Sequence, residues 1–429
     1  MKELFSLEQM THYLRERSCF FNHHLKLVPL QSPALNDIPL IDNSHYWHGS
    51  HDLAQWPVLT GPVDDAMFFK TGGTTSKGKL AVYTHGEWQA LVQPFGKSLS
   101  CQLNNGDRVA NLFFTGDLSA GFLFIHEALN HVDVSISEFP FTGNSDLQGL
   151  NTAIIEHRIN VLAGIPAQLM KFAAHLATSG QVLRGVDTLL YGGESVFPGQ
   201  LATFAKVFPN ARVASIGYAS VDAGLIGATS RDCELGEHRT FDDHTLLEIV
   251  DEQMGQVINE CQRVGLLVVT NKSRRLMPIL RYPVGDRACW LEPAGTPKRK
   301  FALRGRSALS QRVRVGMISL VIDEIHAMIQ QMAGSEQWQL RIEQVEEIDH
   351  LSVNWVSEHD ASTAAEISQA LYQAFVTKHP FITLLTEDGQ LIFQVKPCDV
   401  ASISLHPRSG KQLRVLDLRV YGAAPELTA

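Results

Sequence analysis

The chain has 429 residues, of which 45% are hydrophobic and 19% are charged, a balance typical of soluble globular proteins. Its formal net charge of −9 disfavours nucleic acid as the main partner. No apolar run approaches the roughly 20 residues of a membrane-spanning helix, and the first residues do not follow the pattern of a signal sequence. From the sequence we therefore expect a cytoplasmic protein with no membrane partner.

A run of hydroxyls, glycines and lysines occupies residues 71–79, with the sequence Thr-Gly-Gly-Thr-Thr-Ser-Lys-Gly-Lys. Glycines let the backbone approach a ligand, successive N–H groups form an anion-binding concavity, and lysine supplies the countercharge. The run nearly matches a Walker A motif, but Leu80 stands where a Ser or Thr must bind Mg²⁺. We predict a phosphate-binding loop outside the P-loop NTPases; a polar turn between strands is the alternative.

From residue 108 to residue 217, apolar strand-like runs alternate with amphipathic helical segments, the pattern of a mostly parallel α/β sheet. We expect strands at 108–114, 132–136, 159–164, 186–191 and 212–218, and helices at 119–130, 167–178 and 198–208. In open α/β sheets, ligands bind outside the carboxyl ends of the strands. The segments 192–194 and 218–222, at two of these ends, are therefore candidate binding loops.

The second half of the chain predicts two further arrangements. Short alternating strands at 245–250, 265–271 and 288–291 indicate an antiparallel β subdomain. Beyond a basic loop at 292–300 we expect a separate small α+β unit. Its expected elements are apolar residues at helical spacing from Ile318 to Ile329, strands at 339–344, 352–356 and 391–395, and a helix at 363–377.

Taken in chain order, five segments resemble motifs of the adenylate-forming, or AMP-binding, superfamily. They are residues 71–79, 191–194 (Tyr-Gly-Gly-Glu), 218–222 (Tyr-Ala-Ser-Val-Asp), 281–286 (Arg-Tyr-Pro-Val-Gly-Asp) and 407–411 (Pro-Arg-Ser-Gly-Lys). Their spacing is most similar to the phenylacetate–CoA ligase branch, and the resemblance runs from about residue 68 to the C-terminus. Residues 217–224 look most similar to enzymes that adenylate phenazine carboxylic acids in antibiotic biosynthesis.

The resemblance implies an α/β fold with two domains. The first is an N-terminal AMP-binding domain over residues 1–305, with mostly parallel sheets at about 68–235 and an antiparallel β subdomain at about 236–300. The second is a small α+β lid domain over residues 306–429, which carries Lys411.

Several residues then have candidate roles in binding ATP. Tyr218 offers a flat face on which adenine can stack, and Gly192 and Gly193 leave room for the purine edge. Asp286 follows a glycine turn, where its carboxylate can accept hydrogen bonds from ribose hydroxyls. The remaining predicted ATP contacts are Thr71, Gly72, Gly73, Thr74, Thr75, Lys77, Glu194, Ala219 and Arg306. The alternatives are a core tyrosine at Tyr218, an Asx turn at Asp286 and a surface charge at Arg306.

A metal ligand and a catalytic lysine complete the predicted site. Asp222 supplies the hard oxygen that Mg²⁺ on a triphosphate needs, although a helix N-cap is its alternative role. The resemblance implies that Lys411 reaches the carboxylate and the α-phosphate in the transition state. Two departures stand out: Val221 and Asp222 replace the usual Thr-Glu pair, and Ala308 replaces a charged hinge residue.

The predicted activity is ATP-dependent adenylation of a carboxylic acid to acyl-AMP and pyrophosphate, followed by acyl transfer to CoA or another thiol or amine. ATP and Mg²⁺ are the expected cofactors, with CoA a candidate co-substrate. Phe114, Gly164, Tyr191 and Gly217 suggest a pocket for a flat, aromatic acid, unless these aromatics only pack the sheet. An acyl-protein or carrier-protein ligase and a non-catalytic nucleotide-binding homologue stay open as alternatives, as do a homodimer and a carrier-protein partner.

Overall fold

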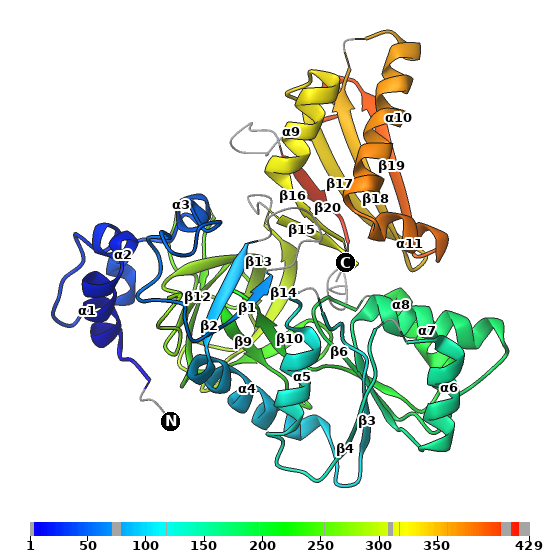
Figure 1. Cartoon of the computed structure of the whole chain (residues 1–429), viewed down its shortest axis with the longest axis horizontal. Coiled ribbons are helices and arrows are strands. Elements are labelled where there is room, and N and C mark those ends of the chain that lie inside the picture. The colour runs from blue at the N-terminus through cyan, green and yellow to red at the C-terminus, as the bar shows by residue number, and fades with distance from the viewer. Residues whose placement is uncertain are drawn as a thin grey trace. The chain divides into compact units, whose positions relative to one another are not determined.

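The computed structural model describes residues 4–70, 79–116, 118–143, 145–196, 198–252, 254–307, 312–316, 318–357, 359–404 and 413–419. These residues form two compact units, of which the larger reaches to Arg304 and the smaller begins at Gly305 (Figure 1). Within the described ranges, no helix has the length and apolar character needed to cross a lipid bilayer.

A five-stranded parallel sheet organises the middle of the larger unit. Its strands, in spatial order, are β4 (Ser137–Pro140), β3 (Arg108–Asn111), β5 (Val161–Gly164), β6 (Thr188–Tyr191) and β7 (Arg212–Ser215). The helices α6 (Leu147–Glu156), α7 (Pro166–Thr178) and α8 (Pro198–Val207) lie together on one side of it, as Figure 1 shows. These three helices share one hydrophobic core with the sheet. The helices α4 (His85–Leu99) and α5 (Gly121–Leu129) belong to a second hydrophobic core, which also includes side chains of the sheet. Because both faces are covered, every residue of the central strands β5 and β6 is buried.

The expected strand at 132–136 is wrong, because the strand of this region is β4 at Ser137–Pro140. Val132, Val134 and Ile136 still pack their side chains against the core. Their apolar alternation, which predicted a strand, therefore reflects burial in a connecting segment instead of a hydrogen-bonded ladder.

A seven-stranded sheet adjoins the parallel one within the larger unit. Its strands, in spatial order, are β11 (Thr245–Val250), β12 (Gly265–Asn271), β13 (Tyr282–Trp290), β14 (Lys300–Arg306), β10 (Glu237–Thr240), β9 (Gly224–Ala228) and β8 (Tyr218–Ser220). The pairings are antiparallel, as the short alternating runs predicted. The expected strand 212–218 is divided, however: it leaves the parallel sheet after Ser215 and enters the antiparallel sheet at Tyr218.

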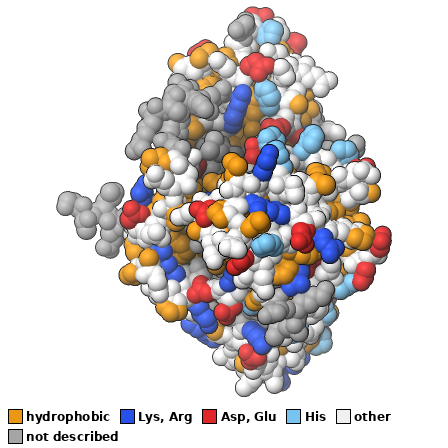
Figure 2. All heavy atoms as spheres, turned by 90° about the vertical axis from the view of Figure 1, so that its left-hand side faces the viewer, with side chains coloured by type: hydrophobic (Ala, Val, Ile, Leu, Met, Phe, Trp, Pro, Cys, Tyr) orange, Lys and Arg blue, Asp and Glu red, His pale blue; other side chains and the backbone are white. Residues whose placement is uncertain are grey.

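The amino-terminal segment packs on the loop that leads into β13. Its elements are α1 (Leu7–Arg17), α2 (Cys19–His24), a 3₁₀ turn at Leu35–Asp37 and α3 (Asn43–Trp47), followed by the hairpin β1 (Ala66–Lys70) and β2 (Leu80–Thr84). The Tyr46 hydroxyl donates to the carbonyl oxygen of Pro278 at 2.9 Å, and the Thr60 hydroxyl donates to that of Arg275 at 2.7 Å. On the face that Figure 2 shows, acidic, basic and hydrophobic side chains are interspersed among the described residues.

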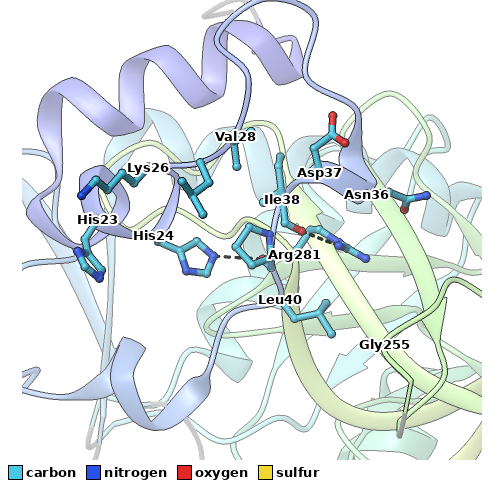
Figure 3. Close-up of a pocket in the computed structure, with 12 residues that line it drawn as sticks. His23, His24, Lys26, Val28, Asn36, Asp37, Ile38, Leu40, Gly255 and Arg281 are labelled. Carbon is cyan, nitrogen blue, oxygen red and sulfur yellow. Dashed lines mark hydrogen bonds between the residues drawn. The ribbon is translucent and has the colours of Figure 1, made fainter.

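A surface pocket of about 770 Å³ lies between this segment, Arg281 just before β13, and Gly255 in the connection from β11 to β12. Figure 3 shows His24, Ile38 and Arg281 around it, with His24 hydrogen-bonded to the carbonyl of Pro39. The guanidinium of Arg281 donates to both oxygens of Glu248 at 2.9 Å, and the two side chains are 5% and 6% exposed. None of the predicted nucleotide-binding residues that the structure describes lines this pocket.

The smaller unit has its own core. The hairpin β15 (Arg312–Val315) and β16 (Ile318–Val321) precedes a four-stranded sheet in the order β19 (Leu391–Cys398), β18 (Ile348–Val356), β17 (Trp338–Val345) and β20 (Val415–Asp417). The helices are α9 (Ile322–Ala333), α10 (Ala361–Lys378) and α11 (Phe381–Glu387). Trp338, Trp355 and Phe375 are fully buried in this core. The apolar residues from Ile318 therefore begin as a strand and become helical only at Ile322, which corrects the expectation of a single helix.

The buried ion pair predicts a large stability effect. Replacing Glu248 by alanine leaves the Arg281 guanidinium buried without its carboxylate, so we expect the free energy of unfolding to fall by about 3–5 kcal/mol. Urea denaturation followed by tryptophan fluorescence measures it. Glu252→Ala, which removes the partner of the half-exposed Arg287, is the control and should cost less than about 1 kcal/mol. Equal losses in the two variants would contradict this account of Glu248.

Candidate functional site

The predicted phosphate loop connects two paired strands. Lys70 at the end of β1 lies opposite Leu80 at the start of β2. A P-loop leads from a strand into a helix, whereas this loop leads into a strand, so the structure excludes a Walker A arrangement. Thr71, Gly72, Gly73, Thr74, Thr75 and Lys77 lie outside the described residues. The ammonium of Lys79, which follows them, lies 5.2 Å from the ring centroid of Trp47.

Two glycines stand where the parallel sheet ends and the antiparallel sheet begins. Tyr191 and Ser215 are partners at the carboxyl ends of β6 and β7, so the segments that follow them emerge side by side. A Cβ on Gly192 would stand 2.6 Å from the side chain of Ile216. Gly217 has φ +122°, and a Cβ there would stand 2.8 Å from the ring of Phe95. Because of this φ value and the nearby ring, the chain can turn from one sheet into the other at residue 217 only with glycine there.

Tyr218 and Asp286, which the sequence predicted as adenine and ribose contacts, meet in the structure. The hydroxyl of Tyr218 on β8 donates to Oδ2 of Asp286 on β13, and both residues are half-buried. The ring of Tyr218 lies 5.7 Å from the ring of the buried His238, whose Nε2 is 3.0 Å from the Ser215 hydroxyl. Burial lowers the pKa of His238 to about 4, so this histidine stays neutral beneath Tyr218.

Asp222 is held by hydrogen bonds to both of its carboxylate oxygens. Oδ1 accepts from the Ser220 hydroxyl at 2.7 Å and from the backbone N–H of Ala223 at 3.0 Å. Oδ2 accepts from the hydroxyl of Tyr282 at 2.8 Å. Since each carboxylate oxygen can accept about two such bonds, Oδ2 retains capacity for a further partner.

The geometry fits a Mg²⁺ ion that arrives with a nucleotide. Among the described residues, no group of three or more His, Cys, Asp or Glu side chains could hold a metal ion by itself. Mg²⁺ with nucleotides is usually held by one or two carboxylates and by the phosphates, and Asp222 supplies one such carboxylate. Its role as a metal ligand stays a prediction.

Sequence patterns did not identify the residues that support Asp222. The hydroxyl of Tyr83 on β2 donates to the carbonyl oxygen of Val221 at 2.8 Å, and the amide of Asn271 donates to that of Ala223 at 3.0 Å. Tyr282 lies inside the motif at 281–286, which was the only available signal. Tyr83 and Asn271 belong to no motif, so only the folded chain reveals them.

The buried cation Arg274 lies next to Tyr83, one of the residues that hold the turn around Asp222. Arg274 is fully buried, and its guanidinium lies 3.6 Å from the ring centroid of Tyr83 while Nη1 donates to the carbonyl oxygen of Val82 at 2.7 Å. Its Nε and Nη2 atoms have no hydrogen-bond partner among the described residues. Burial raises the pKa of Tyr83 to about 12, so its hydroxyl keeps the proton that it donates to Val221.

The predicted acyl-pocket residues lie near the carboxyl ends of neighbouring strands. Phe114 follows β3 and is half-buried, Gly164 ends β5, and Gly217 follows β7. Tyr191 ends β6, and its hydroxyl accepts the backbone N–H of Gly236 at 3.3 Å. Burial raises the pKa of Tyr191 to about 12. The ring of Tyr191 belongs to the core beside α7 and α8, and its contact with an acid stays a prediction.

The other predicted residues are placed as follows. Gly193 has φ +79° and precedes Glu194, and both follow β6. Ala219 lies on β8, and Arg306 is the half-buried last residue of β14. Lys411 and Ala308 lie outside the described residues.

The chain was compared with known proteins. No protein-family profile matches it. Over 297 residues it is 26% identical to the phenylacetate–coenzyme A ligase of Thermus thermophilus, a match that spans 65% of this chain and 63% of that homologue. A solved 2-hydroxyisobutyryl–CoA ligase, in complex with its acyl-AMP and CoA, is similar in fold, with a TM-score of 0.71 and 18% identity over 96% of this chain and 88% of that one.

A third comparison points to the same fold. An amide bond synthetase from Marinactinospora thermotolerans has a TM-score of 0.51 and 15% identity, over 80% of this chain and 67% of that one. The chain therefore has the fold of the adenylate-forming enzymes and is similar in sequence to a phenylacetate–CoA ligase.

The turn between the sheets predicts a strict requirement for glycine. Gly217→Ala adds a methyl group both to a strained backbone and against Phe95, so we expect it to lower the free energy of unfolding by at least about 2 kcal/mol. Gly180→Ala is the matched control, because Gly180 has φ +65° but nothing within 4 Å of an added Cβ. Urea denaturation compares the two. If Gly217→Ala cost no more than Gly180→Ala, Phe95 would not restrict the turn.

Proposed function

We propose that this chain, which has the fold of the adenylate-forming enzymes, activates a carboxylic acid with ATP to give acyl-AMP and pyrophosphate. The observation that carries the proposal is the contact between Tyr218 and Asp286, with Asp222 in the turn that follows β8, two residues after the end of that strand. In this proposal Tyr218 would stack on adenine, Asp286 would bind the ribose and Asp222 would hold the metal. The support is that β8 and its turn follow the carboxyl end of β7, the side of such sheets where ligands bind.

In the proposed reaction, a carboxylate oxygen of the acid attacks the α-phosphorus of ATP in line. The new bond joins that oxygen to phosphorus, and the bond from the α-phosphorus to the bridging oxygen breaks as pyrophosphate leaves. The protein supplies mainly positioning and charge stabilisation. Tyr218 and Asp286 would fix the nucleoside, residues 71–79 would bind the β- and γ-phosphates, and Lys411 would stabilise the charge that gathers at the α-phosphate.

Asp222 would hold Mg²⁺ through Oδ2, the carboxylate oxygen with remaining capacity. When bound, the metal would neutralise phosphate charge, and Asp222 would anchor it to the turn after β8. The side chain of Asp222 is one methylene shorter than that of the glutamate in the related motif. The orientation of its carboxylate therefore matters more. Hydrogen bonds from Ser220, Ala223 and Tyr282 supply that orientation.

The acyl acceptor that we favour is the thiol of CoA, because both the phenylacetate ligase and the 2-hydroxyisobutyryl ligase are CoA ligases. The sulfur would attack the acyl carbon of the adenylate, and AMP would leave. The amide bond synthetase makes an amine the second candidate acceptor. A carrier-protein thiol uses the same first half-reaction.

An aromatic acid is the proposed substrate, on the basis of Phe114 and of the glycines Gly164 and Gly217 at the strand ends. The proposal includes a cytoplasmic location and a role in antibiotic biosynthesis, where such an acid would be activated. A homodimer is also part of the proposal.

The function is tested by pyrophosphate exchange into ATP with a panel of aryl, hydroxy and fatty acids, run with and without CoA. We expect at least one aryl acid to support exchange, and thioester to form when CoA is added. ATP binding without exchange for any acid would favour a non-catalytic nucleotide-binding protein. Exchange with an aryl acid but no thioester with CoA, together with amide formation when an amine is supplied, would favour an amine acceptor.

The role proposed for Lys411 predicts how much this side chain contributes to the rate of adenylation. Lys411→Ala should slow pyrophosphate exchange by on the order of 10²-fold or more, because it removes a preorganised donor to the transition state. Lys396→Ala, at an exposed position of β19, is the control and should leave the exchange rate unchanged. Exchange by Lys411→Ala at the wild-type rate would show that this lysine is not catalytic.

A further inference from the structure

The indole of Trp47 lies between two parts of the proposed site. Its Nε1–H donates to the hydroxyl of Tyr282 at 3.0 Å, and that hydroxyl donates to Oδ2 of Asp222 at 2.8 Å. The ammonium of Lys79, at the end of the predicted phosphate loop, lies 5.2 Å from the centroid of the same indole. We propose that Trp47 and Tyr282 are positioning residues, which orient Asp222 toward the metal of the nucleotide and couple it to the end of the phosphate loop.

The direction of this hydrogen-bond chain is fixed by chemistry. An indole N–H can only donate, so the Tyr282 oxygen must accept from Trp47. Tyr282 has a single proton, and it therefore points at Asp222. Trp47 and Tyr282 are 6% and 3% exposed, so bulk water has little access to compete for these bonds. The chain can form only if Asp222 presents Oδ2 to Tyr282, which fixes the rotation of the carboxylate.

Trp47 is itself held rigidly. Its ring stacks on Trp56 with centroids 5.3 Å apart and an interplanar angle of 22°, and it meets Tyr46 edge-on at 5.4 Å. The short helix α3 that carries it is capped by Asp42, whose side chain accepts the backbone N–H groups of Ser44 and His45. A rigid donor makes the position of the Tyr282 hydroxyl, and hence of Asp222, independent of ligand.

The coupling to Lys79 follows from the shared indole. A cation over the face of tryptophan is attracted by the ring, and the attraction grows where water is excluded. Trp47 therefore contacts Lys79 through its face and Tyr282 through its edge. An amino-terminal helix that precedes all five motifs becomes part of the proposed phosphate and metal site.

The inference rests on the proposed function, and its test measures nucleotide binding instead of turnover. Isothermal titration gives the dissociation constant of a non-hydrolysable ATP analogue with Mg²⁺ and with EDTA, and the ratio of the two reports the contribution of the metal. Tyr282→Phe keeps the ring and removes the proton donor. We expect the strengthening by Mg²⁺ to fall about tenfold or more in this variant, as when other residues that orient metal ligands are changed. Trp47→Phe should reduce it in the same direction.

Two matched controls separate positioning from general destabilisation. Tyr46→Phe removes a buried hydroxyl that donates to the carbonyl of Pro278 but keeps the ring that meets Trp47, and Trp290→Phe removes a buried indole N–H that donates to the carbonyl of Ile258. Both should keep the wild-type ratio even where they lower the melting temperature.

The inference is overturned if Tyr282→Phe keeps the wild-type ratio, or if the controls lose as much as it does. It is also overturned if Mg²⁺ does not strengthen nucleotide binding by the wild-type chain. Pyrophosphate exchange by the wild type decides the proposed function separately, so the two failures are distinguishable.

Discussion

Three hydrogen bonds from neighbouring strands hold the carboxylate of Asp222 and the backbone around it, and the proposed site depends on them. The donors are Tyr83 to Val221, Tyr282 to Asp222 and Asn271 to Ala223, at 2.8, 2.8 and 3.0 Å. They come from β2, β13 and the end of β12. Because each donor belongs to a different strand, the turn is fixed only when the hairpin and the antiparallel sheet have assembled around it. The metal-directed carboxylate is thus placed by the fold as a whole.

The same assembly explains an otherwise costly feature of the core. A fully buried guanidinium is unfavourable when some of its N–H groups have no partner, as holds for Arg274 among the residues that the structure describes, yet Arg274 is retained against the ring of Tyr83. Its contact with Tyr83 and its hydrogen bond to Val82 join the loop before β13 to β2. Arg274 therefore supports the residue that holds Val221. Gly217 contributes on the other side, because its turn brings Tyr218 from the end of the parallel sheet to Asp286.

The sequence could predict those parts of the fold that depend on local pattern. The strands at 245–250 and 265–271 have the predicted bounds, because alternation and flanking turns define them. The segment 132–136 resembled a strand because its apolar residues are partly buried against the core, and burial alone does not reveal hydrogen bonding. Motif order predicted Tyr218, Asp222 and Asp286 as one site, and the structure joins the first and the last. Trp47 and Arg274 escaped prediction since their roles depend on contacts between distant segments.

The central claim is that the chain transfers the AMP portion of ATP to a carboxylate. The most direct measurement supplies ATP labelled at the α-phosphate, with Mg²⁺ and the acid panel, and follows the label by chromatography. We expect the label to pass into acyl-AMP and then into AMP, with pyrophosphate as the other product. Label recovered in ADP, or label that stays in ATP with every acid although the nucleotide binds, would contradict it.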